Sequence, residues 1–321
     1  MRIFLSSVTT LVLALLVLCV AGCASLHEQS SVPNPPSQEP TGALAGRQPL
    51  VALVLSGGSA RAFAHIGVIK VLEEIGITPD IIVGTSAGSL VGVAYAAGMN
   101  ARQLAAAARE FDAALLQDFT LPNLGLPLLR GELGFVRGER LQAYVQQLVA
   151  ERPLEALARP MAVVATDLQS GMPVAFTRGH AGLAVRASSS VPGIFVPPTI
   201  HGRMYVDGQV SSPVPVAIAR RLGAEIVIAV DATFPAERAE ISSMVSVLFQ
   251  SFTISSQRIA AAEMASATVV IRPAVNASGQ LGLTDWQWVM DAGEHAARAV
   301  LPALRGIRER MAARDANALP V

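Results

Sequence analysis

The sequence contains one motif with the residue types and spacing of an activated serine. The motif is GTSAG at residues 84–88, between a short apolar run at 81–83 and a stretch of small residues typical of a helix start. A serine can attack a carbonyl carbon when a tight turn holds its hydroxyl outward and a base takes its proton, and glycines two positions away make room for that turn. The start of the next helix favours the negative charge that develops. We predict that Ser86 is a nucleophile; the alternative is a small-residue turn that only packs a strand against a helix.

A glycine-rich loop, SGGSAR at residues 56–61, follows an apolar run at 50–55. The tetrahedral intermediate of acyl transfer needs backbone N–H donors for its oxyanion, and a glycine-rich turn before a helix exposes several of them. This loop and Ser86 would follow neighbouring strands of a parallel sheet, at the edge where ligand sites form. A phosphate-binding loop is the alternative, but the segment has neither G-x-G-x-x-G nor a Gly-Lys-Ser/Thr ending.

The base that would activate Ser86 has few candidates. The histidines are at positions 27, 65, 180, 201 and 295. Packing or capping is the simplest role for His65, and His295 lies in a charged helical segment typical of a solvated face, although it would complete a Ser, Asp, His order. We therefore prefer the carboxylate of Asp207, in the segment MYVDGQ at 204–209. An Asp-Gly pair is also a common hairpin turn, so this residue alone is a weak signal.

Hydrophobic periodicity predicts alternating strands and helices around these motifs. Apolar runs of strand length occur at 50–55, 81–83, 161–166, 225–230 and 268–271, and helical stretches at 68–75, 141–148, 242–265 and 285–311. Strand, helix, strand, helix is the pattern of a parallel sheet with right-handed crossovers. We expect an α/β fold with a mainly parallel central sheet flanked by helices.

Composition limits the partners and the number of domains. The chain has 321 residues, of which 52% are hydrophobic and 15% charged, which suits one large domain that we place at residues 49–312, with a tail at 313–321. Lys+Arg and Asp+Glu are 24 each, and no basic run is present, so a nucleic-acid partner is not expected. Neither a cofactor nor a metal is expected.

The N-terminal segment is typical of secretion. Residues 1–22 combine Arg2, an apolar run at 11–20 that is shorter than the roughly 20 residues of a membrane span, and small residues before Cys23. The sequence VAGC resembles a bacterial lipobox, which implies that Cys23 is lipidated and becomes the mature N-terminus. An ordinary signal peptide or an uncleaved anchor is the alternative. Residues 23–48 are rich in Ser and Pro and are expected to be a flexible tether; Ala24, rather than aspartate, favours an outer-membrane location in the cell envelope by analogy.

Four segments in this order resemble the patatin-like phospholipase family: VLSGGSARAFAHIGVIKVLEE at 54–74, GTSAG, ASSSVPGIF at 187–195 and YVDG at 205–208. The resemblance implies a three-layer patatin-like α/β fold and a Ser-Asp dyad without histidine that hydrolyses acyl esters of phospholipids or other lipids. Ser86 then corresponds to the nucleophile and Asp207 to the aspartate, and the 188–192 stretch should shape the wall of the site. The positions that correspond to the oxyanion loop and its basic residue are Gly57, Gly58, Ser59, Ala60 and Arg61.

The chain departs from the family pattern at three positions. Glycine is usual where Ser59 and Ala62 stand, and a small residue where Gln209 stands. If position 59 requires a positive φ, a serine there is strained, which would reduce the efficiency of the oxyanion hole. The alternative function is therefore a weak or inactive envelope lipoprotein that binds lipid or a protein partner with the same fold. Membrane lipids are the expected partners, as substrate and as the site of anchoring.

Overall fold

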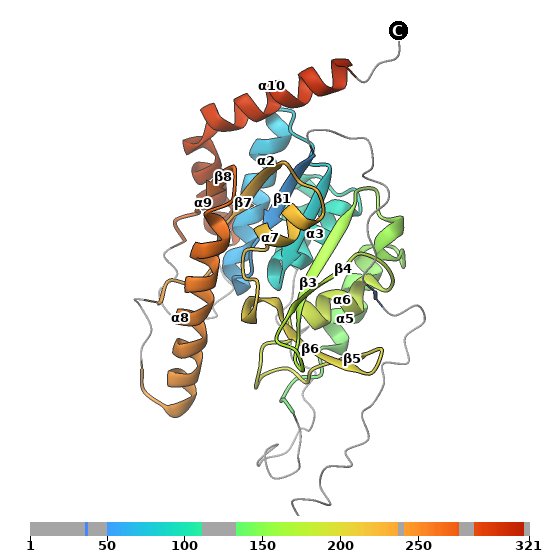
Figure 1. Cartoon of the computed structure of the whole chain (residues 1–321), viewed down its shortest axis with the longest axis vertical. Helices are drawn as coiled ribbons and strands as arrows, with labels where there is room; N and C mark the ends of the chain where they lie inside the picture. The colour runs from blue at the N-terminus through green and yellow to red at the C-terminus, as the bar shows by residue number, and fades with distance from the viewer. Residues whose placement is uncertain (1–35, 38–49, 111–132, 237–240, 276–285, 318–321) are drawn as a thin grey trace, which may run out of the picture.

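The computed structural model describes residues 36–37, 50–110, 133–236, 241–275 and 286–317 of the chain. These residues form an eight-stranded sheet with helices against it (Figure 1). The predicted leader, Cys23 and most of the predicted tether lie outside the described residues. Two residues of that tether are described, and one of them, Ser37, donates its backbone N–H to the carbonyl oxygen of Arg178 at 3.1 Å.

The central part of the sheet is parallel. The hydrogen-bonded order is β5-β6-β3-β2-β1-β7-β8, with β4 paired to β3. Strands β3, β2, β1, β7 and β8 run parallel, whereas β4 and β6 run antiparallel to β3, and β5 antiparallel to β6. The strands are β1 (Val51–Leu55), β2 (Ile81–Thr85), β3 (Met161–Asp167), β4 (Pro173–Phe176), β5 (Thr199–Ile200), β6 (Arg203–Asp207), β7 (Ile226–Val230) and β8 (Val269–Ile271).

Strand β1 shows how the sheet separates two hydrophobic cores. Its alternate residues Val51, Leu53 and Leu55 are fully buried in one core, and Ala52 and Val54 in the other. Successive side chains of a strand point to opposite faces, so a strand covered on both faces is apolar throughout. The first core also contains side chains of α2 (Ala64–Glu74), α3 (Ala87–Ala96), α4 (Ala101–Glu110), α5 (Glu139–Leu148), α6 (Ala181–Ser188), α9 (Trp286–Ala299) and α10 (Leu301–Asn317). The second contains side chains of α7 (Val216–Arg221) and α8 (Met244–Met264), which confirms the predicted three-layer α/β fold.

Helices α2 and α9 approach each other closely at two glycines. A Cβ atom on Gly67 would lie 1.9 Å from the carbonyl oxygen of Met290, and one on Gly293 would lie 1.9 Å from that of Ala64. Real Cβ atoms do not tolerate such distances, so both positions require glycine at this helix spacing. The contact fixes the helix that follows the glycine-rich loop against the C-terminal part of the chain.

The C-terminal helical segment differs from the prediction. The single helix predicted at 285–311 is two helices, α9 and α10, separated at Val300. Pro302 explains the break, because proline is tolerated in the first turn of a helix but clashes with the preceding turn inside one. Helix α10 also includes residues 313–317, which were predicted to be tail. None of the described helices has both the length and the apolar character needed to cross a bilayer.

Candidate active site

Ser86 occupies a sharp turn between β2 and α3. Its backbone has φ 52° and ψ −129°, a conformation that costs a non-glycine residue free energy and recurs at functional sites. The flanking glycines are required by contact: a Cβ atom on Gly84 would lie 2.7 Å from Cα of Ser89, and one on Gly88 2.3 Å from the carbonyl oxygen of Ser56. The motif therefore folds as predicted, with the serine at the tip of the turn.

The register of β3 brings the end of β2 next to the end of β6. Val164 of β3 pairs with Thr85 of β2, and the next residue, Ala165, pairs with Asp207 of β6. Since β4 pairs with residues 163–166 of β3 and a strand has only two edges, β2 and β6 lie on the same edge and meet end to end. The C-terminal ends of the two strands thus converge.

Ser86 and Asp207 are hydrogen-bonded at this junction. The Ser86 hydroxyl donates to Oδ2 of Asp207 at 2.7 Å, and the backbone N–H of Gln209 donates to Oδ1 at 2.8 Å. Asp207 is fully buried, and this burial raises the pKa of its carboxyl from 3.8 to about 7, although both hydrogen bonds favour the charged form. A carboxyl group with this pKa is a base that can take a proton near neutral pH and give it back.

The glycine after Asp207 has a packing role. A Cβ atom on Gly208 would lie 2.4 Å from the carbonyl oxygen of Val164 and 2.9 Å from Cγ2 of Thr85. Gly208 begins the short helix η6 (Gly208–Val210) and does not form a hairpin turn. The Asp-Gly pair thus lets the aspartate approach the end of β2.

Ser188, the last residue of α6, holds the backbone of the nucleophile. Its hydroxyl accepts the backbone N–H of Ser86 at 2.8 Å and donates to the carbonyl oxygen of Val164. Both residues are buried, so the backbone N–H of Ser86 has no water to bond to and depends on the Ser188 hydroxyl as its acceptor. The 188–192 stretch, predicted to shape the wall of the site, therefore also supports the turn at its first residue.

A cavity of about 540 Å³ opens beside Ser86. No charged side chain of the described residues lines it. The lining residues are Ser59, Ala60, Ala62, Phe63, Ser86, Ala87, Leu90, Val91, Leu141, Ser189, Val191, Ile194, Phe195, Gln209, Thr233, Phe234, Phe249, Phe252, Thr253 and Ser256. The aromatic residues of α8, Phe249 and Phe252, were not among the predicted site residues, because a helical repeat does not reveal which face meets a cavity.

The glycine-rich loop has three backbone N–H groups without a partner among the described residues, and two of their residues, Ser59 and Ala60, line the same cavity as Ser86. The N–H of Gly57 already donates to the carbonyl oxygen of Pro213 at 3.2 Å. Those of Gly58, Ser59 and Ala60 have no acceptor within the described part of the chain, because they precede or begin the 3-10 helix η2 (Ser59–Phe63). Ser59 has φ 50°, so the position does require the left-handed region and the serine is strained there.

The structure places Arg61 outside the cavity lining. Its Nε donates to the carbonyl oxygen of Ala232 at 3.0 Å, another guanidinium nitrogen donates to that of Val275, and the group lies 5.7 Å from the ring centre of Phe234. Arg61 was predicted to belong to the oxyanion loop as its basic residue. The buried guanidinium of Arg61 binds the backbone carbonyl groups of Ala232 and Val275 and so holds these two segments against the loop. This role is structural.

A model of the patatin-like phospholipase family matches residues 53–220, slightly more than half of the chain. The chain belongs to this family. The match includes the glycine-rich loop, Ser86 and Asp207, so the predicted family is confirmed. Membership of the patatin-like family supports the predicted enzyme class, a lipid acyl hydrolase.

Three relatives show how far the similarity extends. An uncharacterized NTE family protein of Mycobacterium tuberculosis is 36% identical over 182 residues, which cover 57% of this chain and 49% of the relative. A second one from the same organism is 31% identical over 288 residues, covering 81% of this chain and 47% of the relative. The patatin-like phospholipase domain-containing protein 6 of Mus musculus is 32% identical over 190 residues, 56% of this chain and 13% of the mouse protein. The chain thus spans about half the length of the two bacterial relatives and a much smaller share of the mouse protein.

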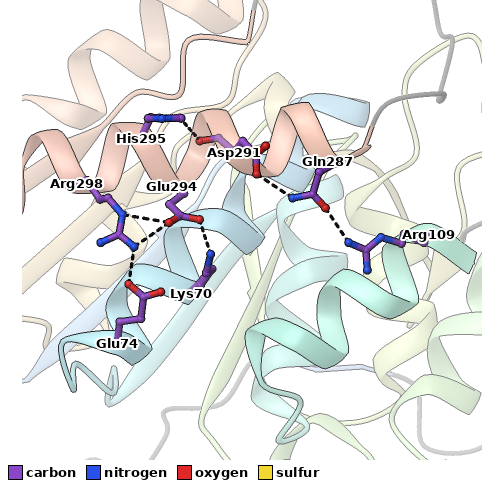
Figure 2. Close-up of polar contacts among 8 residues, drawn as sticks. All are labelled: Lys70, Glu74, Arg109, Gln287, Asp291, Glu294, His295 and Arg298. Atoms are coloured by element: carbon purple, nitrogen blue, oxygen red, sulfur yellow. Dashed lines mark hydrogen bonds and ion pairs between the residues drawn. The ribbon is translucent and has the colours of Figure 1, made fainter.

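None of the four histidines in the described part of the chain is hydrogen-bonded to the Ser86 hydroxyl. Nε2 of His65 donates to the carbonyl oxygen of Ser56 at 2.9 Å, and burial lowers the pKa of His65 to about 4, so the ring is neutral. His295 is exposed on α9, where Nδ1 lies 2.8 Å from the carbonyl oxygen of Asp291 (Figure 2). Its neighbour Glu294 is bound by Lys70 of α2, which marks this face as a solvated ion-pair surface. The described residues contain no cluster of metal-ligating side chains.

Proposed function

We propose that this protein hydrolyses acyl ester bonds of lipids, with Ser86 as the nucleophile and Asp207 as its base. The observation that carries the proposal is the 2.7 Å contact between Ser86 Oγ and Asp207 Oδ2 at the wall of a mostly apolar cavity. Membership of the patatin-like phospholipase family supports the same reaction class.

The first half of the proposed reaction forms an acyl enzyme. Ionised Asp207 takes the proton of Ser86 while Oγ bonds to the ester carbonyl carbon, and the carbonyl electron pair moves to oxygen. The free amide groups at Gly58–Ala60 stabilise this oxyanion. When the carbonyl forms again, the bond to the alcohol breaks and the alcohol leaves with the proton held by Asp207.

The second half releases the acyl group. Water gives a proton to Asp207 and its oxygen attacks the acyl carbon, so that a second oxyanion forms in the same place. Collapse of this intermediate breaks the bond to Ser86, which takes the proton back, and a carboxylic acid leaves. Because a single carboxyl group carries the proton in both halves, the mechanism requires no histidine.

The cavity lining supports a substrate with a long apolar acyl chain. Its walls carry aliphatic and aromatic side chains, and its few polar groups are hydroxyls and one carboxamide, that of Gln209. An apolar chain leaves water for such a surface with a gain of about 25 cal/mol per Å² buried. We therefore propose phospholipids or related acyl lipids as the substrate class.

The proposed location follows from the N-terminal sequence. We propose that residues 1–22 are removed, that Cys23 is lipidated, and that the protein is held at the cell envelope, with the outer membrane favoured by Ala24. Metabolic labelling with a radioactive fatty acid tests this proposal, because a Cys23→Ser variant should lose the label. Label retained by that variant would contradict lipidation at Cys23.

A fluorophosphonate probe and a soluble short-chain ester together test the proposed dyad. Wild-type protein should react with the probe and hydrolyse the ester, whereas Ser86→Ala and Asp207→Asn should do neither while keeping the circular dichroism spectrum of the folded protein. His295→Ala, a variant on the far ion-pair surface, should retain the activity. Hydrolysis by Asp207→Asn at the wild-type rate would contradict Asp207 as the base. A wild-type protein that the probe does not label would favour the alternative, an inactive lipid-binding lipoprotein.

A further inference from the structure

Helix α8 consists of two halves with opposite character. From residue 241 to 257 the sequence contains no charged residue, and the charges resume at Arg258. The exposed apolar side chains of this stretch are Ile241 (53% exposed), Met244 (78%), Val247 (49%), Leu248 (62%), Phe249 (37%) and Ile254 (41%). At about 100° per residue, those on the helix fall within an arc of about 220°, which also contains the exposed Ser251 and Ser255. Exposed apolar side chains gathered on one uncharged surface are typical of a site that meets an apolar partner.

The C-terminal half of α8 attaches the helix to the domain. Ala260 and Met264 are buried in the second core. Oε1 of Glu263 accepts the hydroxyl of Ser212, and Oε2 accepts the backbone N–H of Val214 at 3.1 Å. In Figure 1, α8 extends along the edge of the domain with its N-terminal end directed away from β7 and β8. The apolar half is therefore held out at the surface by a fixed C-terminal half.

Four hydroxyl groups of this half bond to its own backbone or to each other. Ser243 and Ser246 form a reciprocal capping box at the helix start. The hydroxyl of Ser251 donates to the carbonyl oxygen of Val247 at 2.8 Å, and that of Thr253 to Phe249 at 2.9 Å. Polar groups that enter a lipid phase must be satisfied within the protein, because no water is available there. These hydroxyls already meet that condition.

The same helix lines the cavity that contains Ser86. Phe249, Phe252, Thr253 and Ser256 are part of its wall. An object seated on the exposed half of α8 therefore lies directly beside the space in which the ester would bind. This arrangement suits a source of substrate.

We propose that the N-terminal half of α8 inserts into the surface of an electrically neutral lipid bilayer and holds the cavity beside it. The inference rests on the proposed lipid acyl hydrolase function, since that function supplies the reason for the cavity to meet a membrane. The absence of charge over residues 241–257 favours apolar insertion over attraction to anionic headgroups. The breadth of the uncharged surface and the local bonds of the Ser251 and Thr253 hydroxyls favour lipid over a second copy of the chain, which would need only a narrow apolar stripe.

A fluorophore on α8 tests the insertion directly. The full chain is prepared with Cys19→Ser and Cys23→Ser, so that the cysteine of Leu248→Cys is the single labelling site for an environment-sensitive dye. Phosphatidylcholine vesicles should shift the emission to shorter wavelength, and nitroxide groups on the acyl chains should quench it, equally at low and high salt. Ala262→Cys, on the exposed face of the attached half, is the matched control and should respond to neither.

Three outcomes would overturn the proposal. One is a Leu248→Cys probe that does not respond to vesicles. Another is a response that requires anionic lipid and disappears in high salt. The third is a shift without vesicles that grows with protein concentration, which would assign the surface to a second copy of the chain.

A pair of charge variants measures the effect on catalysis. Met244→Glu/Leu248→Glu should lower the ratio of vesicle-lipid hydrolysis to soluble-ester hydrolysis by about tenfold or more, because two charges would have to enter the lipid phase. Ala261→Glu/Ala262→Glu adds the same charge to the attached half and should leave the ratio within about twofold of wild type. An equal ratio in the two variants would overturn the proposal. If the wild type hydrolyses neither ester, the proposed function fails, while the probe still decides whether α8 inserts.

Discussion

The side chain of Gln209 lies against Gly57, so closely that a Cβ atom on Gly57 would fall 2.5 Å from Cδ and 2.6 Å from Cγ of Gln209. A methyl group at position 57 must therefore displace the carboxamide from its place beside the glycine-rich loop. We expect Gly57→Ala to lower the unfolding free energy by about 1–3 kcal/mol and to slow ester hydrolysis. Urea denaturation and initial rates measure the two effects.

A double-mutant cycle tests this contact. Gln209→Ala removes the atoms that the new methyl group would meet, so Gly57→Ala/Gln209→Ala should recover most of the loss. A double variant whose loss equals the sum of the two single losses would show that the residues do not interact.

The pH dependence of kcat/KM should follow the ionisation of Asp207. Burial raises the pKa of Asp207 to about 7, and only the ionised carboxyl can accept the proton of Ser86. The rate should rise with pH through about 7 and level off above it. Burial also raises the pKa of Glu263 to about 7, so Glu263→Gln is the control, and it should keep the same inflection. If Glu263→Gln shifts the inflection of the kcat/KM profile, the inflection reports the ionisation of Glu263 and not that of Asp207.

Asp207 should make the protein less stable as the pH rises. Because its pKa is raised in the folded state, its contribution to stability is fully present below 3.8 and is lost as the pH rises through about 7. Asp207→Asn does not titrate, so its unfolding free energy relative to wild type should increase between pH 4 and pH 7, by a few kcal/mol in total. Chemical denaturation of both proteins over this range measures the difference. A difference that is constant with pH would contradict the raised pKa.

Ser188 should affect turnover more than substrate affinity. Ser188→Ala leaves the backbone N–H of Ser86 and the carbonyl oxygen of Val164 without their buried partner, at a cost of about 1–3 kcal/mol. The turn at Ser86 should then be less well held, so kcat should fall by roughly tenfold or more with little change in KM. Ser190→Ala is the matched control, since its hydroxyl bonds only within its own segment, to the carbonyl oxygen of Arg186. Equal kcat values for the two variants would remove this role from Ser188.

Glycine substitutions should distinguish the α2/α9 contact from ordinary helix positions. Gly67→Ala places a methyl group against the backbone of Met290 and should cost about 1–3 kcal/mol or more, because two helices must separate. Gly306→Ala in α10 meets nothing within 4 Å and should instead stabilise the protein by up to about 1 kcal/mol. Thermal denaturation should therefore move Tm in opposite directions. A higher Tm for Gly67→Ala would show that the helices can adjust.

Much of the fold could be predicted because its strands are buried on both faces. The apolar runs at 50–55 and 161–166 became β1 and β3 almost unchanged, and the small residues after Ser86 began α3 as expected. Such strands can be recognised from the sequence alone, because every residue in them must be apolar. The glycines around Ser86 were equally informative, because close backbone contacts exclude every other residue type.

The pairing of distant segments could not be predicted. The short strands β4 and β5 have little periodicity, and nothing in the sequence gives the register in which Asp207 meets Ala165. Ser188 is one of three consecutive serines, so its bond to Ser86 has no sequence signal. Arg61 matched a family position, but the carbonyl groups that bind it come from residues 232 and 275, far along the chain.

The convergence of β2 and β6 on β3 also sets the order of events during folding. Ser86 and Asp207 are 121 positions apart in the chain. Their contact exists only once β6 has paired with residues 165–167 of β3, beyond the part of β3 that pairs with β2. Closing so long a loop comes late, because its entropy cost must be met by contacts formed earlier. The reacting hydroxyl therefore acquires its carboxylate only when the chain is nearly native, and recovery of activity during refolding would report the last stage of assembly.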